Sequence, residues 1–261
     1  MLTAPHASAD PAMIVKPMAL TSEQIKSYKD EGFVLIRGLI SPETAAALRR
    51  EVMEIMNKIG LPMTKLKQTT EYLEGGDVDA LVNSPGLNSV AQQLLEGPST
   101  VYMPFTAVKS GGGGGRFHFH QDNQYTRHDG PSCNLWIALM PMMPENGCLQ
   151  VVPRSHLNGT FEAVGTPDDD SHRRVKWEPK DFVSVNMEPG DCVAFTRLTV
   201  HGSGQNSTDD ARVAYAIQYH RDDVRWLERE TNTWKSLKEF PRWKVGPVKE
   251  ITVPKGKTDG H

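Results

Sequence analysis

The chain has 261 residues, of which 38% are hydrophobic and 23% charged, and its formal net charge is −3. The near balance of charge argues against nucleic acid or an anionic membrane as the main partner. No apolar stretch approaches the roughly 20 residues that cross a bilayer, and residues 1–20 lack the pattern of a secretory signal. The cysteines Cys133, Cys148 and Cys192 form no paired motif, which favours a cytoplasmic protein.

The first hundred residues predict mostly helices. Residues 1–20 show no periodicity and predict a loose N-terminal arm. A capping box indicates a helix over Thr21–Asp30, and an apolar run predicts a strand over 33–36. Ser41 is expected to cap a longer helix, because a proline follows it and apolar residues then recur at helical spacing. We therefore expect a helical N-terminal part over 21–100.

The pattern changes at about Val101, where short apolar runs alternate with Gly, Pro and Asn. The runs are 101–108, 116–125, 134–140, 148–153, 181–186, 191–197 and 211–219. This rhythm favours an antiparallel barrel or sandwich over β-α-β units. We expect a single mainly β domain over 21–261 with flanking helices. Its core would span about 101–221, and its C-terminal tail would pack on that core.

The segment 116–125 contains the residues that point to chemistry. If it is a strand, alternate side chains share a face, and four polar residues point the same way: His118, His120, Asp122 and Gln124. Two imidazoles and a carboxylate pack poorly in a core and are good metal ligands. His120 and Asp122 can reach one ion together. An isolated His-x-Asp motif is common by chance, so its context matters.

That context lies downstream, where His201 is followed eleven residues later by Arg212. The residues that alternate with Arg212 are Ala214, Ala216 and Gln218, which leave room for a ligand. Two histidines and a carboxylate on strands form the triad of non-haem Fe(II) oxygenases, which leaves coordination positions free. An arginine in the same cavity can bind a carboxylate through two parallel hydrogen bonds.

These motifs together resemble the phytanoyl-CoA dioxygenase family of Fe(II)- and 2-oxoglutarate-dependent oxygenases. The resemblance spans roughly Glu31 to Tyr219 and includes four stretches: Asp30-Glu-Gly-Phe-Val-Leu, His120-Gln-Asp, Glu145-Asn-Gly-Cys-Leu and Pro153-Arg-Ser-His. Arg154 departs from the family, which usually has glycine there. The segment 61–100 aligns with nothing familiar, and in such enzymes this region contributes to substrate choice.

The resemblance implies a double-stranded β-helix, the jelly-roll or cupin-like core. It implies three iron ligands, namely His120, Asp122 and His201. Arg212 would bind the distal carboxylate of the cosubstrate 2-oxoglutarate, with Ser203 and Trp136 beside it. O2 would be the second cosubstrate, and the products would include succinate and carbon dioxide.

The remaining candidates concern the substrate. His118, Gln124 and Asn134 are expected to contact it, and no catalytic group is expected beyond the metal site. The glycines Gly111–Gly115 suit either a mobile lid near the site or a plain connection. Related halogenases have a small residue where Asp122 stands, so the resemblance favours oxidation over halogenation.

The sequence therefore predicts an oxygenase that hydroxylates a small organic molecule and exists as a monomer or homodimer. Two alternatives stay open. One is another jelly-roll metalloenzyme, a hydrolase or isomerase, which would not need Arg212. The other is a non-catalytic metabolite sensor, which would not consume oxygen. The motifs specify neither the substrate nor the choice between hydroxylation, desaturation, ring closure and epoxidation.

Overall fold

A computed structural model describes residues 10–60, 66–166, 169–240 and 246–251. Its centre is a six-stranded antiparallel sheet in the order β1-β10-β5-β12-β3-β2. The strands of this sheet are β1 (Phe33–Ile36), β2 (Leu66–Lys67), β3 (Ser99–Lys109), β5 (Ser132–Ala138), β10 (Cys192–Thr196) and β12 (Arg212–Arg221). Except for β3 and β2, neighbouring strands in the sheet are not consecutive in sequence, as the predicted jelly roll requires.

A second, four-stranded sheet has the order β4-β11-β6-β9. Its strands are β4 (Phe117–His120), β6 (Leu149–Val151), β9 (Val183–Ser184) and β11 (His201–Ser203). One hydrophobic cluster joins the sheets, since it includes Trp136 and Phe195 of the large sheet and Leu149 and Val151 of the small one. These two antiparallel sheets form the predicted jelly-roll core.

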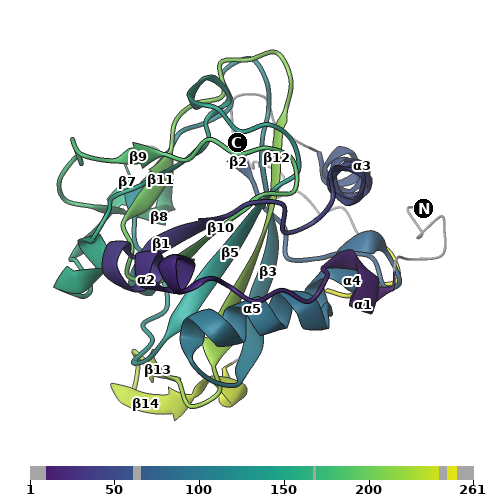
Figure 1. Ribbon diagram of the computed structural model, residues 1–261. Coiled ribbons are helices and arrows are strands. Elements are labelled where there is room, and N and C mark those ends of the chain that lie inside the picture. The colour runs from purple at the N-terminus through teal and green to yellow at the C-terminus, as the bar shows by residue number, and fades with distance from the viewer. Residues whose placement is uncertain (1–9, 61–65, 167–168, 241–245, 252–261) are drawn as a thin grey trace.

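In the described ranges, five α-helices flank the large sheet (Figure 1): α1 (Pro11–Ile14), α2 (Ser22–Glu31), α3 (Pro42–Ile59), α4 (Asp77–Val82) and α5 (Pro85–Leu95). Both α3 and α5 contact β12. The apolar residues of these helices share one cluster with Val213, Tyr215, Ile217 and Tyr219 of that strand. The helices therefore cover the face of the sheet that points away from the small sheet. In the described part of the chain no helix is long and apolar enough to cross a membrane.

The sequence-predicted elements near the N-terminus are confirmed. The Thr21 hydroxyl accepts a hydrogen bond from Gln24 N at 3.2 Å, and Thr21 N donates to Gln24 Oε1 at 2.8 Å, which completes the capping box of α2. Ser41 caps α3 by accepting from Thr44 N at 3.1 Å, with proline at the first helical position. The strand β1 has the bounds expected of it.

The expectation of a loose arm is wrong for residues 10–20. Asp10 caps α1 through a 2.9 Å hydrogen bond from Ala12 N. Ile14, Val15 and Leu20 are buried in the main hydrophobic cluster, and α1 contacts α4 and α5. A single helical turn is too short to show periodicity in the sequence, so only its packing partners reveal it. Residues 1–9 lie outside the described part of the chain.

The glycine run is tied to the chain beside it. Gly112 N donates to Thr208 O and Gly113 N to Asn206 O, both at 2.8 Å, and Gly114 forms a β-bridge with Asn206. A side chain at Gly111 would collide with the backbone, because a Cβ there would lie 1.9 Å from Asp209 O. The structure favours a close-packed connection over a lid, since none of the five glycines lines the cavity described below.

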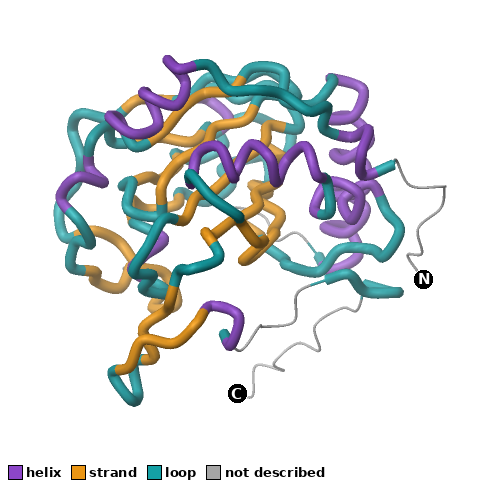
Figure 2. The backbone as a smooth tube through the Cα atoms, turned by 60° about the horizontal axis from the view of Figure 1, so that its bottom comes forward, coloured by secondary structure: helices purple, strands orange, loops and turns teal. Residues whose placement is uncertain are grey.

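The tail forms a hairpin and then returns to the body. The hairpin consists of β13 (Arg225–Glu228) and β14 (Thr233–Ser236) and projects from one end of the molecule (Figure 2). Trp226 packs edge-on against Phe240, with ring centroids 4.8 Å apart. Val248 N then donates to Tyr72 O at 2.9 Å, and Ile251 is fully buried.

Arg154 has a φ of 61°, in the left-handed region where glycine is favoured. Its N–H donates to Glu31 O at 2.8 Å, so the turn is anchored to the end of α2. We expect Arg154→Gly to leave the free energy of unfolding unchanged or raise it by up to about 1 kcal/mol, since strain relief outweighs the added entropy of the unfolded chain. Arg154→Val should lower it by about 1 kcal/mol. Urea unfolding measures both, and a destabilised glycine variant would contradict the assigned backbone conformation.

Candidate metal centre and cavity

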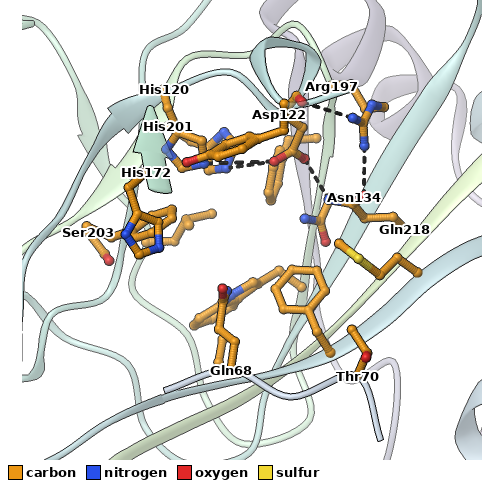
Figure 3. Close-up of a pocket in the computed structure, with 18 of the residues that line it drawn as sticks. Gln68, Thr70, His120, Asp122, Asn134, His172, Arg197, His201, Ser203 and Gln218 are labelled. Atoms are coloured by element: carbon orange, nitrogen blue, oxygen red, sulfur yellow. Dashed lines mark hydrogen bonds and ion pairs between the residues drawn. The ribbon is translucent and has the colours of Figure 1, made fainter. Parts of the chain in front are cut away.

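A cavity of about 770 Å³ lies between the two sheets. Residues of both sheets line it, among them Tyr102, Phe105 and Trp136 from the large sheet and His120 and His201 from the small one. Figure 3 shows part of this lining, with the two histidines and Asp122 close together on one side. The sequence-predicted iron ligands therefore meet in one place.

The backbone brings the three ligands together. His201 opens β11 and is the direct cross-strand partner of His120, which ends β4. Asp122 follows in a short 3₁₀ turn over Asp122–Gln124. One donor atom from each residue lies within 4.8 Å of the others, and Asp122 Oδ1 is 3.8 Å from His120 Nε2 and 3.7 Å from His201 Nε2. All three side chains are buried.

The hydrogen bonds of both rings prepare them for a metal ion. His120 Nδ1 donates to His118 O at 2.8 Å, and His201 Nδ1 donates to Thr199 O at 3.0 Å. A carbonyl can only accept, so each Nδ1 carries a proton, and Nε2 is the nitrogen of each ring that is left to bind a metal ion. Burial, with the neighbouring His201, lowers the pKa of His120 to about 3. Neutral imidazole and carboxylate are the ligand types that suit iron, so these residues fit the ion that the resemblance implies.

Arg212 is a buried cation in the same cavity. It is 2% exposed, and its guanidinium carbon lies 5.2 Å from the centre of the Trp136 ring. Burial lowers its pKa to about 10, so it stays charged at neutral pH. Among the described residues no carboxylate pairs with it, and its Nε has no hydrogen-bond partner. A buried guanidinium without a counter-ion is a site prepared for an anion.

Ser203 also lines the cavity, and Lys109 supports the backbone around it. Lys109 Nζ donates to Ser203 O at 3.3 Å and to Gly204 O. Burial, and then the charge of Arg212, lowers the pKa of Lys109 to about 6. Lys109 is thus mostly neutral above that pH, and Arg212 supplies the positive charge at this end of the cavity. The sequence analysis did not single out Lys109.

The predicted common face of the 116–125 segment is wrong, for two structural reasons. First, His201 pairs with His120 while Ser203 pairs with Phe117, so two residues of β4 face Gly202 alone. This β-bulge changes which side chains face inward. Phe117 lines the cavity, with its ring 4.5 Å from that of His120, whereas the side chain of His118 does not line it.

Second, the strand ends at His120, and the 3₁₀ turn aims Gln124 elsewhere. Gln124 Nε2 donates to Phe161 O at 3.2 Å, and its Oε1 accepts from Gln121 N at 3.1 Å. Gln124 therefore holds two loops together outside the cavity. Asn134, the third expected substrate residue, does line the cavity, and its Oδ1 is buried without a hydrogen-bond partner.

Several lining residues were missed by the sequence analysis. They are Tyr102 and Met103 of β3, Phe117, His172 of β8 (Asp169–Val175) and Arg197. β8 forms a hairpin with β7 (Ala163–Thr166), which brings His172 to the cavity. Arg197 lies four residues before His201, yet it follows the end of β10, where alternation no longer predicts direction.

Comparison with known proteins gives concordant results. The sequence model of the phytanoyl-CoA dioxygenase (PhyH) family matches residues 28–214. A probable phytanoyl-CoA dioxygenase of Caenorhabditis elegans is 28% identical over 264 residues, which cover 84% of this chain and 82% of that protein. This match extends beyond the segment 101–221 into the helical part.

Two solved structures are similar in fold. EvdO2 from Micromonospora carbonacea var. aurantiaca, complexed with 2-oxoglutarate, has a TM-score of 0.67 at 20% identity over 78% of this chain and 92% of that chain. The non-haem α-ketoglutarate-dependent carbocyclase SnoK from nogalamycin biosynthesis has a TM-score of 0.65 at 23% identity, over 81% of this chain and 89% of that chain. These similarities confirm the fold class.

The isolated charge of Arg212 generates a stability prediction. Replacing a buried charge by an apolar residue of similar volume removes a desolvation cost, so Arg212→Met should stabilise the ligand-free protein by about 1 to 4 kcal/mol. Arg50→Met is the matched control, because Arg50 is exposed on α3 and should change stability by less than about 0.5 kcal/mol. Chemical unfolding of the metal-free proteins provides the measurement. A strongly destabilised Arg212→Met variant would mean that an internal partner already balances the charge.

Proposed function

The chain belongs to the phytanoyl-CoA dioxygenase family, and from this premise we propose that its cavity binds a small organic molecule and hydroxylates it. The protein is a dioxygenase that uses iron and 2-oxoglutarate. The observation that carries the proposal is the pairing of two buried features in one cavity. One is the histidine pair beside Asp122, whose Nδ1 atoms donate to backbone carbonyls, and the other is the guanidinium of Arg212, which has no carboxylate partner among the described residues.

In this proposal each feature has one task. His120, Asp122 and His201 would hold the iron, and the atoms that approach one another are the two Nε2 atoms and Oδ1. The guanidinium of Arg212 binds the distal carboxylate of 2-oxoglutarate, and Trp136 packs against that guanidinium. Iron with 2-oxoglutarate and O2 supplies the oxidising power, while the cosubstrate leaves as succinate and carbon dioxide. The protein's contribution is to orient the partners and to exclude water from a buried site.

The rest of the lining supports a small-molecule substrate. The cavity volume of about 770 Å³ lies within the usual range of roughly 300 to 1,000 Å³ for ligand sites. Beyond the metal and cosubstrate residues, aromatic and aliphatic side chains alternate with polar groups, including Tyr102, Met103, Thr70, Tyr125 and His172. A mixed wall of this kind suits an organic molecule with an apolar body and a few polar substituents.

The direct test is cosubstrate turnover. Purified protein with Fe(II), 2-oxoglutarate and a panel of small organic molecules should consume O2 and form succinate, and a true substrate should raise both rates together. A hydrolase or isomerase would act on its substrate without 2-oxoglutarate. A sensor would bind 2-oxoglutarate and consume no oxygen. A hydroxylated product identified by mass spectrometry would separate hydroxylation from desaturation, ring closure and epoxidation.

The role of Arg212 predicts a specific kinetic change. Arg212→Met should raise the KM for 2-oxoglutarate about 100-fold or more, since it removes a buried charge-assisted pair of hydrogen bonds. Arg212→Lys keeps the charge and loses the forked geometry, so its effect should be smaller. Succinate formation at varied 2-oxoglutarate measures both. An unchanged KM in the methionine variant would remove Arg212 from the cosubstrate site.

The ligand assignment predicts a contrast between two neighbouring histidines. His120→Ala should abolish Fe(II) binding while the circular dichroism spectrum stays that of the wild type. His118→Ala is the control, because the side chain of His118 does not line the cavity and the change keeps its backbone carbonyl. Anaerobic titration calorimetry measures both dissociation constants. Full iron binding by the His120 variant would refute the assignment.

A further inference from the structure

The two oxygens of Asp122 have different surroundings. Oδ1 faces the two imidazole Nε2 atoms at 3.8 and 3.7 Å. Oδ2 accepts a hydrogen bond from Gln218 Nε2 at 3.0 Å. Both residues are buried, Asp122 with 7% and Gln218 with 3% of its surface exposed. One oxygen is therefore left for a metal ion, and the other is occupied by the protein.

Arg197 fixes which way the Gln218 amide points. Arg197 Nη1 donates to Gln218 Oε1 at 2.7 Å. Because a guanidinium has only donors, the amide oxygen must face Arg197, and the amide NH₂ must then face the carboxylate. Figure 3 shows Arg197, Gln218 and Asp122 joined by these interactions. The Gln218 amide therefore links the guanidinium of Arg197 to the carboxylate of Asp122, and the two charged groups form no direct ion pair.

Arg197 also holds the turn that carries Asp122. Its Nη2 donates to the backbone carbonyls of Asp122, at 2.9 Å, and Thr126, at 3.0 Å. Its guanidinium lies 5.3 Å from the centre of the Tyr102 ring. The same side chain thus fixes the backbone of Asp122 directly and its carboxylate through Gln218.

Stability alone does not explain this arrangement. Arg197 is 4% exposed, its Nε has no hydrogen-bond partner, and within the described ranges no carboxylate forms an ion pair with it. Burying a guanidinium in this way opposes folding. The charge lies one amide away from the carboxylate of the proposed metal centre, which indicates a functional reason for keeping it.

We propose that Arg197 and Gln218 are positioning residues that keep Asp122 a one-oxygen ligand of the iron, an inference that rests on the proposed function. The hydrogen bond to Oδ2 fixes the rotation of the carboxylate, so Oδ1 is already directed at the two imidazoles and Oδ2 stays off the ion. Coordination positions therefore stay free for the cosubstrate and O2. Hydrogen-bonded partners of metal-ligating carboxylates typically act in this way. Losing this fixed orientation should lower metal affinity.

The register of β12 links this support to the cosubstrate site. Gln218 lies six residues after Arg212 on the same face of β12, with Ala214 and Ala216 between them. Gln218 is also the cross-strand partner of Asn134, which lines the cavity. The strand β12 therefore positions both Arg212, which is proposed to bind 2-oxoglutarate, and Gln218, which donates to Asp122.

The test measures metal affinity rather than turnover. Mn(II), which is stable in air, is titrated calorimetrically into metal-free wild type, Gln218→Met and Gln218→Asn. The methionine has the length of glutamine without its donor, and the asparagine keeps the amide but is too short to reach Oδ2. Gln150→Met is the control, because Gln150 alternates with the inward-facing Leu149 and Val151 on β6. Thermal unfolding of each metal-free protein confirms that it is folded.

We expect both Gln218 variants to bind Mn(II) about 10 to 100 times more weakly than wild type, and the control to be unchanged. Arg197→Lys, which keeps the charge, should bind more tightly than Arg197→Met. Folded Gln218 variants with affinities within twofold of wild type would overturn the inference and leave the proposed function intact. If the methionine variant does not fold, the asparagine variant decides. Wild type that binds no divalent metal would overturn the proposed function and this inference together.

Discussion

The alternation of side chains along β12 is the constraint on which the rest of the structure depends. One face of this strand carries large apolar residues into the cluster under the helices. The other face carries Arg212, two alanines and Gln218 toward the small sheet. The apolar face anchors the strand in the main core, and the small residues leave space on the opposite face. A shift of one residue in register would exchange the two faces and destroy the cavity.

Several buried polar groups around the cavity reduce the stability of the fold. Two guanidinium groups, those of Arg212 and Arg197, lie buried near it without a direct carboxylate partner among the described residues. Two buried histidines are held in fixed orientations by backbone carbonyls that accept from their Nδ1 atoms. Each of these features opposes or restricts folding, and the helices α3 and α5 compensate by burying apolar surface on the far side of the sheet. The helix-covered face of the large sheet thus stabilises the fold, while its opposite face carries residues of the proposed site.

Features with a local cause were predictable from the sequence. The capping box of α2, the cap and proline of α3 and the two faces of β12 depend on neighbouring residues or on regular periodicity. The proposed metal ligands and Arg212 were predicted from their residue types and spacing together with the family resemblance, and the structure places all four side chains at one cavity. The β-bulge opposite Gly202 and the 3₁₀ turn at Asp122 were not, because both depend on strand pairing that the sequence does not display. Because of these two features, His118 and Gln124 lie outside the cavity, contrary to the prediction, and Phe117 lines it. Arg197 was missed for a related reason, since it lies beyond the end of a strand.

The central claim is that iron and 2-oxoglutarate bind together at the centre formed by His120, Asp122 and His201, beside Arg212. The most direct measurement is an anaerobic absorption titration of the metal-free protein with Fe(II) and 2-oxoglutarate. The account predicts a weak visible charge-transfer band that appears only when both are present and disappears in Arg212→Ala. No band at saturating concentrations of both would show that the cosubstrate does not chelate the metal, and would contradict the account.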